Sequence, residues 1–477
     1  MPVNLFRTIL EENGDYAGPA VYDRDSVLTY PDLFHAAEYL AGQLRAYGIC
    51  RQARVAVLAD DSAEYIAVSL AVLALDAAIV PFSSRAVRSE VEDMMKTMGI
   101  NYLVCAEPFR QENDAELDMP QGFHDRFFVR KMDPEIRPVE LPGGRIPAFI
   151  RFSSGTTGGS KGVILAHETV LERTSACTEL GVSRGEKVFW VLDMAFHFVV
   201  TILLFLRKGA CIVICPPPVE RNMAAVLREH QVSLLYATPY HYRLMTASNE
   251  ITPDMLSRVR RAFSTAMKLE TRDAEAFRAK FSHPLTQAYG IIEVGLPCVN
   301  TSDRTDKTAS VGRLQSAYRL RLADPDPSGA GRIFLNGPGL FDAYLTPFRL
   351  RTELDPQGWF DTGDIGRVDE EGYLFIVGRA KNVINFAGMK VFPYEVETVL
   401  SEHPWVAECR VSGRAAGAFG EVPAAEIVLR ENVTLPDDWI DTLREFCYRR
   451  LASYKVPKFF ETVKDLPHTA SGKLIRK

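Results

Sequence analysis

Hydrophobic and polar positions in the first hundred residues alternate between helical spacing and short apolar runs. Apolar side chains recur at every third or fourth position of 33–44, which predicts a helix that begins after Thr29. Apolar runs at 55–58 and 77–81 predict buried strands, and residues 63–75 predict a helix between them. The alternation of strand, helix and strand favours a parallel sheet flanked by helices, and therefore an α/β fold.

A polar loop follows at 152–163, where the sequence is Phe-Ser-Ser-Gly-Thr-Thr-Gly-Gly-Ser-Lys-Gly-Val. Apolar runs at 148–150 and 163–165 predict a strand on each side of it. Hydroxyl groups, glycines that allow tight turns and one lysine suit a polyphosphate-binding loop. A flexible linker would have a similar composition, but the two flanking strands tether this loop. The candidate phosphate-binding residues are Ser153, Ser154, Gly155, Thr156, Thr157, Gly158 and Lys161.

The loop is not a Walker A motif, because Ser160 stands where that motif requires Gly and Gly162 where it requires Ser or Thr. It resembles the phosphate-binding motif of the adenylate-forming superfamily, which includes acyl-CoA and aryl-CoA synthetases, peptide-synthetase adenylation domains and luciferases. That motif usually has Pro at the position of Ser160. Three further motifs of the superfamily follow in the same order along nearly the whole chain: Gln-Ala-Tyr-Gly-Ile-Ile-Glu at 287–293, Thr-Gly-Asp at 362–364 and Ser-Gly-Lys at 471–473.

The resemblance implies a site for ATP and Mg²⁺. Tyr289 would stack on adenine, and Asp364 would accept hydrogen bonds from both ribose hydroxyls. Glu293 would hold the Mg²⁺, and Arg379 would approach the ribose and the phosphates. The other implied nucleotide contacts are Ala288 and Gly290.

Two polar residues mark the predicted pocket for the acid. His197 matches the position where acyl-CoA synthetases carry a histidine beside the acyl group, and an imidazole at the edge of the core is the alternative. Asp193 lies in an apolar setting, where an unpaired carboxylate is costly. In amino-acid-activating relatives an aspartate at this spacing pairs with the substrate's α-amino group, whereas a structural salt bridge is the alternative. Ala266 and Ala288 complete the predicted pocket.

The resemblance also predicts two domains. Residues 1–379 would form a large N-terminal domain of mixed and parallel sheets flanked by helices, and residues 380–477 a small mobile C-terminal α+β domain. Lys381 matches the hinge position, and Gly388 matches the loop that lines the thiol tunnel after rotation. Lys473 would reach the carboxylate and the α-phosphate during adenylation. The predicted catalytic residues are Lys473, Glu293 and His197.

Composition limits the classes of partner. The chain has 477 residues with 55 basic and 61 acidic side chains, a net charge of −6, which argues against nucleic-acid binding. The eight cysteines contain no Cys-x-x-Cys pair and suit a reducing cytoplasm. No apolar stretch reaches membrane-spanning length, so we expect a cytoplasmic enzyme without membrane insertion.

These features predict an enzyme that uses ATP to convert a carboxylic acid to acyl-AMP with release of pyrophosphate. The acyl group would then pass to a thiol, either coenzyme A or the phosphopantetheine of a carrier protein. A stand-alone amino-acid adenylation enzyme that loads a carrier protein in secondary metabolism is the alternative, which Asp193 favours. A degenerate binding relative is a third hypothesis, because Ser160, Met267 and Ile292 depart from the usual motifs.

Overall fold

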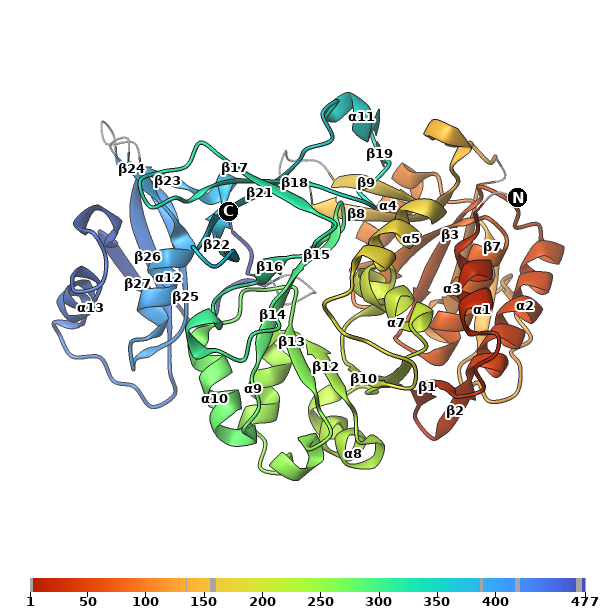
Figure 1. The fold of residues 1–477 in the computed structure, drawn as a ribbon, viewed down its shortest axis with the longest axis horizontal. Helices are drawn as coiled ribbons and strands as arrows, with labels where there is room; N and C mark the ends of the chain where they lie inside the picture. Colours follow the sequence, from red (N-terminus) through yellow and green to blue (C-terminus); the bar gives the residue numbers. More distant parts are fainter. Residues whose placement is uncertain are drawn as a thin grey trace.

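Two large sheets and one small unit make up the described part of the chain (Figure 1). The structure is a computed structural model, and it describes residues 3–133, 135–154, 160–386, 389–416, 421–468 and 474–476. The nine-stranded sheet lies on the N-terminal side of the molecule, the thirteen-stranded sheet spans its middle, and the small unit lies at the opposite end.

The nine-stranded sheet contains the parallel core that the sequence predicts. β3 pairs in parallel with both β4 and β5, and α3 (Ala63–Ala74) crosses from β3 to β4. α3 is almost entirely buried because α1 (Leu5–Asn13) and α2 (Tyr30–Tyr47) cover it. In spatial order the strands are β20 (Phe348–Leu350), β19 (Ala343–Leu345), β9 (Ser160–Ala166), β8 (Pro147–Ser154), β4 (Ala78–Ser83), β3 (Arg54–Ala59), β5 (Tyr102–Ala106), β7 (Phe127–Lys131) and β6 (Ala115–Glu116).

The thirteen-stranded sheet changes from parallel to antiparallel pairing at β14. β10, β11, β12 and β13 pair in parallel, and β14 pairs in parallel with β13 but antiparallel with β15. In spatial order the strands are β17 (Arg319–Ala323), β18 (Gly331–Asn336), β21 (Phe360–Val368), β22 (Tyr373–Arg379), β16 (Gly312–Leu314), β15 (Gly295–Val299), β14 (Thr286–Ile291), β13 (Arg261–Ser264), β12 (Leu234–Ala237), β10 (Lys187–Trp190), β11 (Cys211–Ile214), β1 (Pro19–Asp23) and β2 (Ser26–Thr29).

The small unit is a separate α+β body with its own hydrophobic core. β25 (Val406–Ala415) pairs antiparallel with β26 (Glu421–Leu429), which pairs in parallel with β27 (Phe459–Thr462). α12 (Pro393–Ser401) and α13 (Trp439–Tyr448) share this core, and the hairpin of β23 (Ile384–Phe386) and β24 (Met389–Val391) packs beside β26. The predicted fold class is therefore confirmed, whereas the exact boundary between 379 and 380 stays a prediction.

The other helices cover the sheets and connect their strands. The predicted start of the helix after Thr29 is confirmed, and Thr29 caps it: the Thr29 side chain accepts from the Asp32 N–H, and the Asp32 side chain accepts from the Thr29 N–H. In the described residues no helix combines the length and the apolar character that a membrane span needs. The remaining helices are α4 (Arg88–Met98), α5 (His167–Ala176), α6 (Met194–His197), α7 (Leu203–Arg207), α8 (Val219–His230), α9 (Pro239–Ala247), α10 (Thr271–Phe281) and α11 (Arg351–Leu354).

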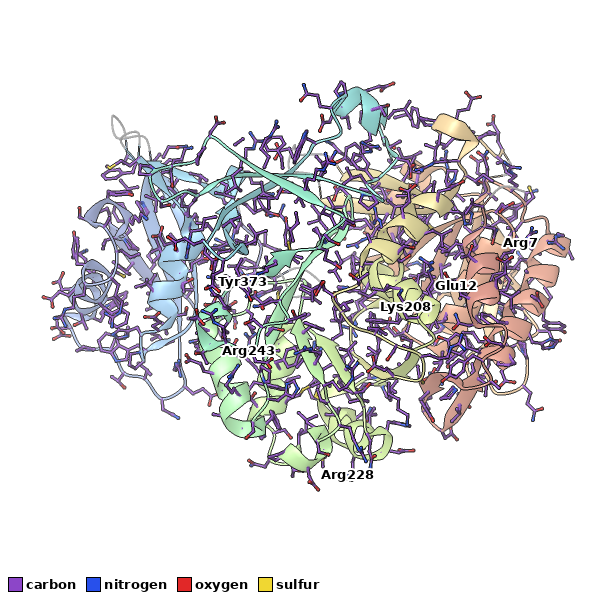
Figure 2. All side chains as sticks on the ribbon, in the orientation of Figure 1. Arg7, Glu12, Lys208, Arg228, Arg243 and Tyr373 are labelled. Carbon is purple, nitrogen blue, oxygen red and sulfur yellow. The ribbon has the colours of Figure 1, made fainter. Side chains whose placement is uncertain are left out.

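A continuous helical run passes from α6 through a π-helical stretch at 198–202 into α7. Its C-terminal end is anchored to the N-terminal helices, since Tyr30 Oη donates to the Leu206 carbonyl oxygen at 3.0 Å. Arg207 forms an ion pair with Glu12 of α1, and Figure 2 shows Glu12 lying close to Lys208 at the end of this run. Because π-helical turns occur often at functional sites, this run favours a functional site near His197.

His167, the first residue of α5, links the N-terminal helix to the core. Its side chain is fully buried, and its Nδ1 accepts the Leu5 N–H at 3.1 Å. Burial lowers the pKa of His167 from 6.5 to about 4, so the ring is neutral at pH 7.

The folded state should lose stability as the pH falls from 6.5 toward 4. In this window the unfolded chain binds a proton at His167 while the folded chain excludes it, and the accumulated loss is on the order of 3 kcal/mol. His167→Asn keeps an acceptor for Leu5 but does not titrate. Its thermal unfolding midpoint should therefore fall less between pH 7 and pH 4.5 than that of the wild type, and an identical pH dependence would contradict the assignment.

Candidate active site

The predicted phosphate loop joins β8 to β9, and these two strands form an antiparallel hairpin. The pairs Ser153 with Lys161 and Ser154 with Ser160 bring the two ends of the loop together. The tether that the apolar runs predict is thus confirmed. The other phosphate-binding candidates, Gly155, Thr156, Thr157 and Gly158, lie outside the described residues.

Three predicted nucleotide contacts meet at the end of β14. The buried carboxylate of Asp364 on β21 accepts a hydrogen bond from Tyr289 Oη at 2.5 Å. Its other oxygen lies 2.6 Å from Nε of Arg379, which is directly opposite Asp364 in the register of β21 and β22. Burial and the nearby Asp364 carboxylate hold the pKa of Tyr289 well above its usual value, so its hydroxyl stays a donor.

The strand end that carries this cluster requires its glycine. A Cβ at Gly290 would lie 2.9 Å from the carbonyl oxygen of Gly295, so a larger residue would force β14 and β15 apart. The neighbouring Ala288 is buried within β14. The motif around Tyr289 therefore has a local structural role in addition to its predicted one.

Tyr344 in β19 lies near both Lys161 and Glu293. Lys161 Nζ is 4.8 Å from the centre of the Tyr344 ring, and burial together with the nearby Glu293 carboxylate raises the pKa of the Tyr344 hydroxyl. Burial raises the pKa of Glu293, while the positive charges of Arg151 and Arg379 oppose that shift. The ends of two predicted motifs, the phosphate loop and the 287–293 segment, are thus brought together by a tyrosine from a third strand.

A metal ion at Glu293 would need ligands from its nucleotide. Among the residues with a described position, no group of three or more His, Cys, Asp or Glu side chains is arranged to hold a metal. Mg²⁺ commonly binds through one or two carboxylates together with substrate phosphates and water. The half-buried carboxylate of Glu293 fits that mode of binding.

Arg173 of α5 holds the backbone that carries Glu293. Its guanidinium is buried and donates to the carbonyl oxygens of Ile292 at 2.9 Å and of Gly339 at 2.9 Å. Burial lowers the pKa of Arg173 to about 10, so the side chain remains charged at neutral pH. Hydrogen bonds from a charged donor are stronger than neutral ones, and these two clamp both loops beside Glu293.

Asp193 has the structural partners that the sequence left open. It caps the N-terminus of α6 by accepting from the Ala195 N–H at 2.9 Å, and Ser83 Oγ donates to its other oxygen at 2.5 Å. Asp61 also faces this helix end and accepts from the Met194 N–H at 2.7 Å. Burial raises the pKa of Asp193, and burial together with the Asp193 charge raises that of Asp61 well above its usual value.

His197 and Ala266, both predicted to line the acid pocket, lie at the end of α6 and just after β13. The His197 ring meets the Trp190 ring edge to face at a centroid distance of 6.2 Å. Ala266 follows β13 with a φ of +68°, a left-handed conformation that glycine adopts without strain. The left-handed backbone conformation at Ala266 therefore costs roughly 1 kcal/mol for an alanine, a cost that glycine would not have.

Lys381 lies in the connection between the thirteen-stranded sheet and the small unit. It is exposed on a single 3₁₀ turn, Ala380–Asn382, between β22 and β23. The structure places it at the junction that the sequence predicts, and its role as a hinge stays a prediction. Gly388 and Lys473 lie outside the described residues.

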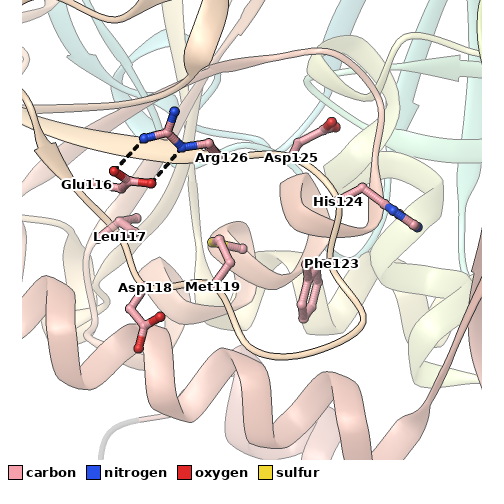
Figure 3. A pocket seen from close by; sticks show the side chains of 8 residues that line it. All are labelled: Glu116, Leu117, Asp118, Met119, Phe123, His124, Asp125 and Arg126. Atoms are coloured by element: carbon pink, nitrogen blue, oxygen red, sulfur yellow. Dashed lines mark hydrogen bonds and ion pairs between the residues drawn. The ribbon is translucent and has the colours of Figure 1, made fainter.

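Figure 3 shows a surface pocket elsewhere on the molecule, beside β6 and β7. Glu116 pairs with Arg126 at its rim, and Arg126 also pairs with Glu107. The eight lining residues belong to 116–126, and all of them lie outside the predicted site.

Comparison with known proteins decides the family. The model of the AMP-binding enzyme family matches residues 11–345, and that of the AMP-binding enzyme C-terminal domain matches residues 395–473. The chain belongs to the AMP-binding enzyme family. Indoleacetate–CoA ligase of Aromatoleum aromaticum is 28% identical over 94% of this chain and 91% of its own. Probable 4-coumarate–CoA ligase 2 of Dictyostelium discoideum is 30% identical over 69% of this chain and 62% of its own.

Solved structures share the fold of this AMP-binding enzyme. ATP-bound MatB from Rhodopseudomonas palustris superimposes with a TM-score of 0.86 at 23% identity, over 99% of this chain and 97% of its own. The anthranilate CoA ligase AuaEII in complex with anthranoyl-AMP gives 0.79 at 22% identity, over 99% and 96% of the two chains. The predicted superfamily is confirmed, and the chain is an AMP-forming acid–thiol ligase.

The sequence motifs did not predict several side chains that shape the site of this AMP-binding enzyme. Arg151 on β8 donates to the Phe196 carbonyl oxygen at 2.7 Å and lies over the Phe196 ring at 4.9 Å. Arg173 donates to the carbonyl oxygen of Ile292, the residue before Glu293, and Tyr344 lies near the Glu293 carboxylate. These residues lack a motif of their own because only the packing of α5, β8 and β19 brings them to Glu293.

Asp364→Asn should weaken ATP binding at least tenfold, because it removes the ion pair with Arg379 and one of the negatively charged acceptors proposed for the ribose. Asp361→Asn is a matched control on the same strand, since Asp361 forms a more exposed ion pair with Arg332. Isothermal titration with ATP measures both variants. Equal weakening in the two variants would contradict a nucleotide role for Asp364.

Proposed function

We propose that this chain activates a carboxylic acid with Mg²⁺-ATP and transfers the acyl group to coenzyme A. The observation that carries the proposal is the meeting of two clusters at one end of β14. One cluster joins Tyr289, Asp364 and Arg379, and the other places Lys161 and Glu293 near Tyr344. The CoA ligases named above support coenzyme A as the acceptor.

In the first step a carboxylate oxygen attacks the α-phosphorus of ATP, and the bond from that phosphorus to the bridging oxygen of pyrophosphate breaks. In the second step a thiolate attacks the acyl carbon, and AMP leaves with the electron pair of the acyl–oxygen bond. Asp364 and Arg379 would orient the ribose, and Lys161 would bind the departing pyrophosphate. Mg²⁺ held near Glu293 would balance the phosphate charge.

The small unit, residues 380–477, would rotate about Lys381 between the two steps. Lys473 would first contact the carboxylate and the α-phosphate, and Gly388 would later line the path of the thiol. Two features support this proposal: the connection at Lys381 is a single exposed turn, and a core of its own lets the small unit move as one body.

Lys473→Ala should lower the rate of adenylate formation at least a hundredfold, since it removes a positive charge from the transition state. Acid-dependent pyrophosphate release across a panel of aliphatic, aromatic and amino acids measures this rate and identifies the acid. Lys464→Ala removes an exposed lysine of the same unit and should keep full activity. Undiminished adenylate formation by Lys473→Ala would contradict the proposed role.

Buried donors around the predicted acid pocket support a polar ligand there. Arg151 Nε, Tyr65 Oη and Trp190 Nε1 are buried without a hydrogen-bond partner within the described part of the chain. Tyr65 lies near Asp61 and Asp193, and Trp190 packs on His197. Because buried donors in proteins are nearly always paired, a bound acid is a suitable partner for this group.

An acid that carries an amino group is the second candidate substrate, and the pair of Asp61 and Asp193 favours it. Both carboxylates face the N-terminus of α6, and burial together with the nearby Asp193 charge raises the pKa of Asp61. An ammonium group would offset that repulsion. The hydrogen bonds of Asp193 to Ser83 and Ala195 equally suit a structural cap, so the two roles need a direct test.

Asp193→Asn keeps an acceptor for the helix cap but removes the charge. If the amine hypothesis holds, kcat/KM should fall more than tenfold for acids with an amino group and stay within twofold for matched acids without one. Asp60→Asn is the control, because Asp60 accepts from Ser84 at the neighbouring position. An equal loss with both classes of acid would instead assign Asp193 to the structure alone.

A further inference from the structure

Arg272 of the large sheet domain reaches across to the small unit. It is the second residue of α10, and its Nη1 donates to the carbonyl oxygens of Ser401 at 2.9 Å and Val406 at 3.3 Å. Its Nη2 donates to the carbonyl oxygen of Ala407 at 2.8 Å. One guanidinium therefore joins the end of α12 to the start of β25.

The chemistry of this contact makes it sensitive to orientation. Ser401 is the last residue of α12, where unpaired carbonyl groups carry the negative end of the helix dipole. The planar guanidinium offers several donors in a fixed geometry, so its acceptors must be correctly placed together. Because all three acceptors are backbone atoms, the contact depends on where the small unit sits rather than on the side chains it carries.

Lys268 makes a second contact one turn earlier on α12. Its ammonium group donates to the Thr398 hydroxyl and to the Tyr394 carbonyl oxygen, the latter at 3.4 Å, and lies 5.7 Å from the centre of the Tyr394 ring. Arg476, close to the end of the chain, lies over the same ring at 4.6 Å and forms an ion pair with Glu397 of α12. Two cations from distant parts of the chain, Lys268 and Arg476, thus lie beside Tyr394.

The two described flanks of the Ser-Gly-Lys segment also contact α12 and β25, the elements that receive Lys268 and Arg272. His468 binds Glu408 of β25 at 2.8 Å and forms a β-bridge with Leu474. The β23–β24 hairpin, which flanks Gly388, lies away from α10 in Figure 1, and Met389 and Lys390 in it are exposed. The observed orientation therefore suits the step that needs Lys473.

We propose that Lys268 and Arg272 form an interdomain latch that holds the small unit in its adenylate-forming orientation. The latch must open before the thiol step. This inference rests on the proposed two-step function, and it assigns both residues a positioning role rather than a catalytic one.

Arg272→Ala should slow adenylate formation about tenfold and leave thioester formation from a purified acyl-adenylate unchanged or faster. Arg272→Lys should restore part of the first rate, because one charged donor remains. Arg278→Ala is the matched control on α10, since Arg278 donates to Asp303 within the large domain. A merely structural role for Arg272 would slow both steps together, and that result would overturn the proposal.

A reversible cross-link tests the orientation directly. Lys268→Cys with Thr398→Cys, in a Cys50→Ser background that removes the exposed cysteine, can be joined by a short cleavable bis-maleimide. The joined protein should form adenylate at no less than half the wild-type rate and form no thioester, and cleavage should restore thioester formation. A joined protein that forms thioester but no adenylate would assign the observed orientation to the other step and overturn the latch.

The two proposals fail in different ways. A wild-type chain that releases no pyrophosphate with any acid would contradict the proposed function. A wild-type enzyme that is active, and whose Arg272→Ala variant keeps the wild-type ratio of the two rates, would contradict the latch alone.

Discussion

The carboxylate of Asp364 is the interaction on which the rest of the site depends. It is buried, and it joins β21 to Tyr289 of β14 and to Arg379 of β22. A buried carboxylate without partners would be strongly destabilising, so these contacts maintain one another. Since Arg379 is the last residue of β22 and Lys381 follows it, the same contacts bind the nucleotide cluster to the interdomain connection.

Arg173, which is buried, and Arg151, which is half-buried, give the site a fixed framework. Burial lowers the pKa of Arg151 and of Arg173 to about 10, yet both remain charged at neutral pH. Each donates to backbone carbonyl groups from elements far apart in the sequence, Arg151 to Phe196 and Arg173 to Ile292 and Gly339. Positive charge is thus held beside Glu293 by the fold itself, where phosphate charge must be balanced.

The small unit adds a different kind of constraint. Its own core is complete, whereas its contact with α10 rests on a few cationic side chains and backbone carbonyl groups. Such a contact is strong in one orientation and is lost in another, because hydrogen bonds depend steeply on geometry. A rigid site on the large domain and a reversible contact beside it suit an enzyme that must use the same cleft for two steps.

The sequence by itself determined the elements and the family. Local patterns sufficed for the helix after Thr29, the strands around the phosphate loop and the motifs at 287–293 and 362–364, since capping, periodicity and motif spacing act over short distances. Tertiary structure alone decided which side chains meet. Tyr344 lies near both Lys161 and Glu293, and Ser83 pairs with Asp193, across separations of up to 183 residues along the chain. Such pairs leave no periodic signal, because they arise only when separate strands and helices pack against one another.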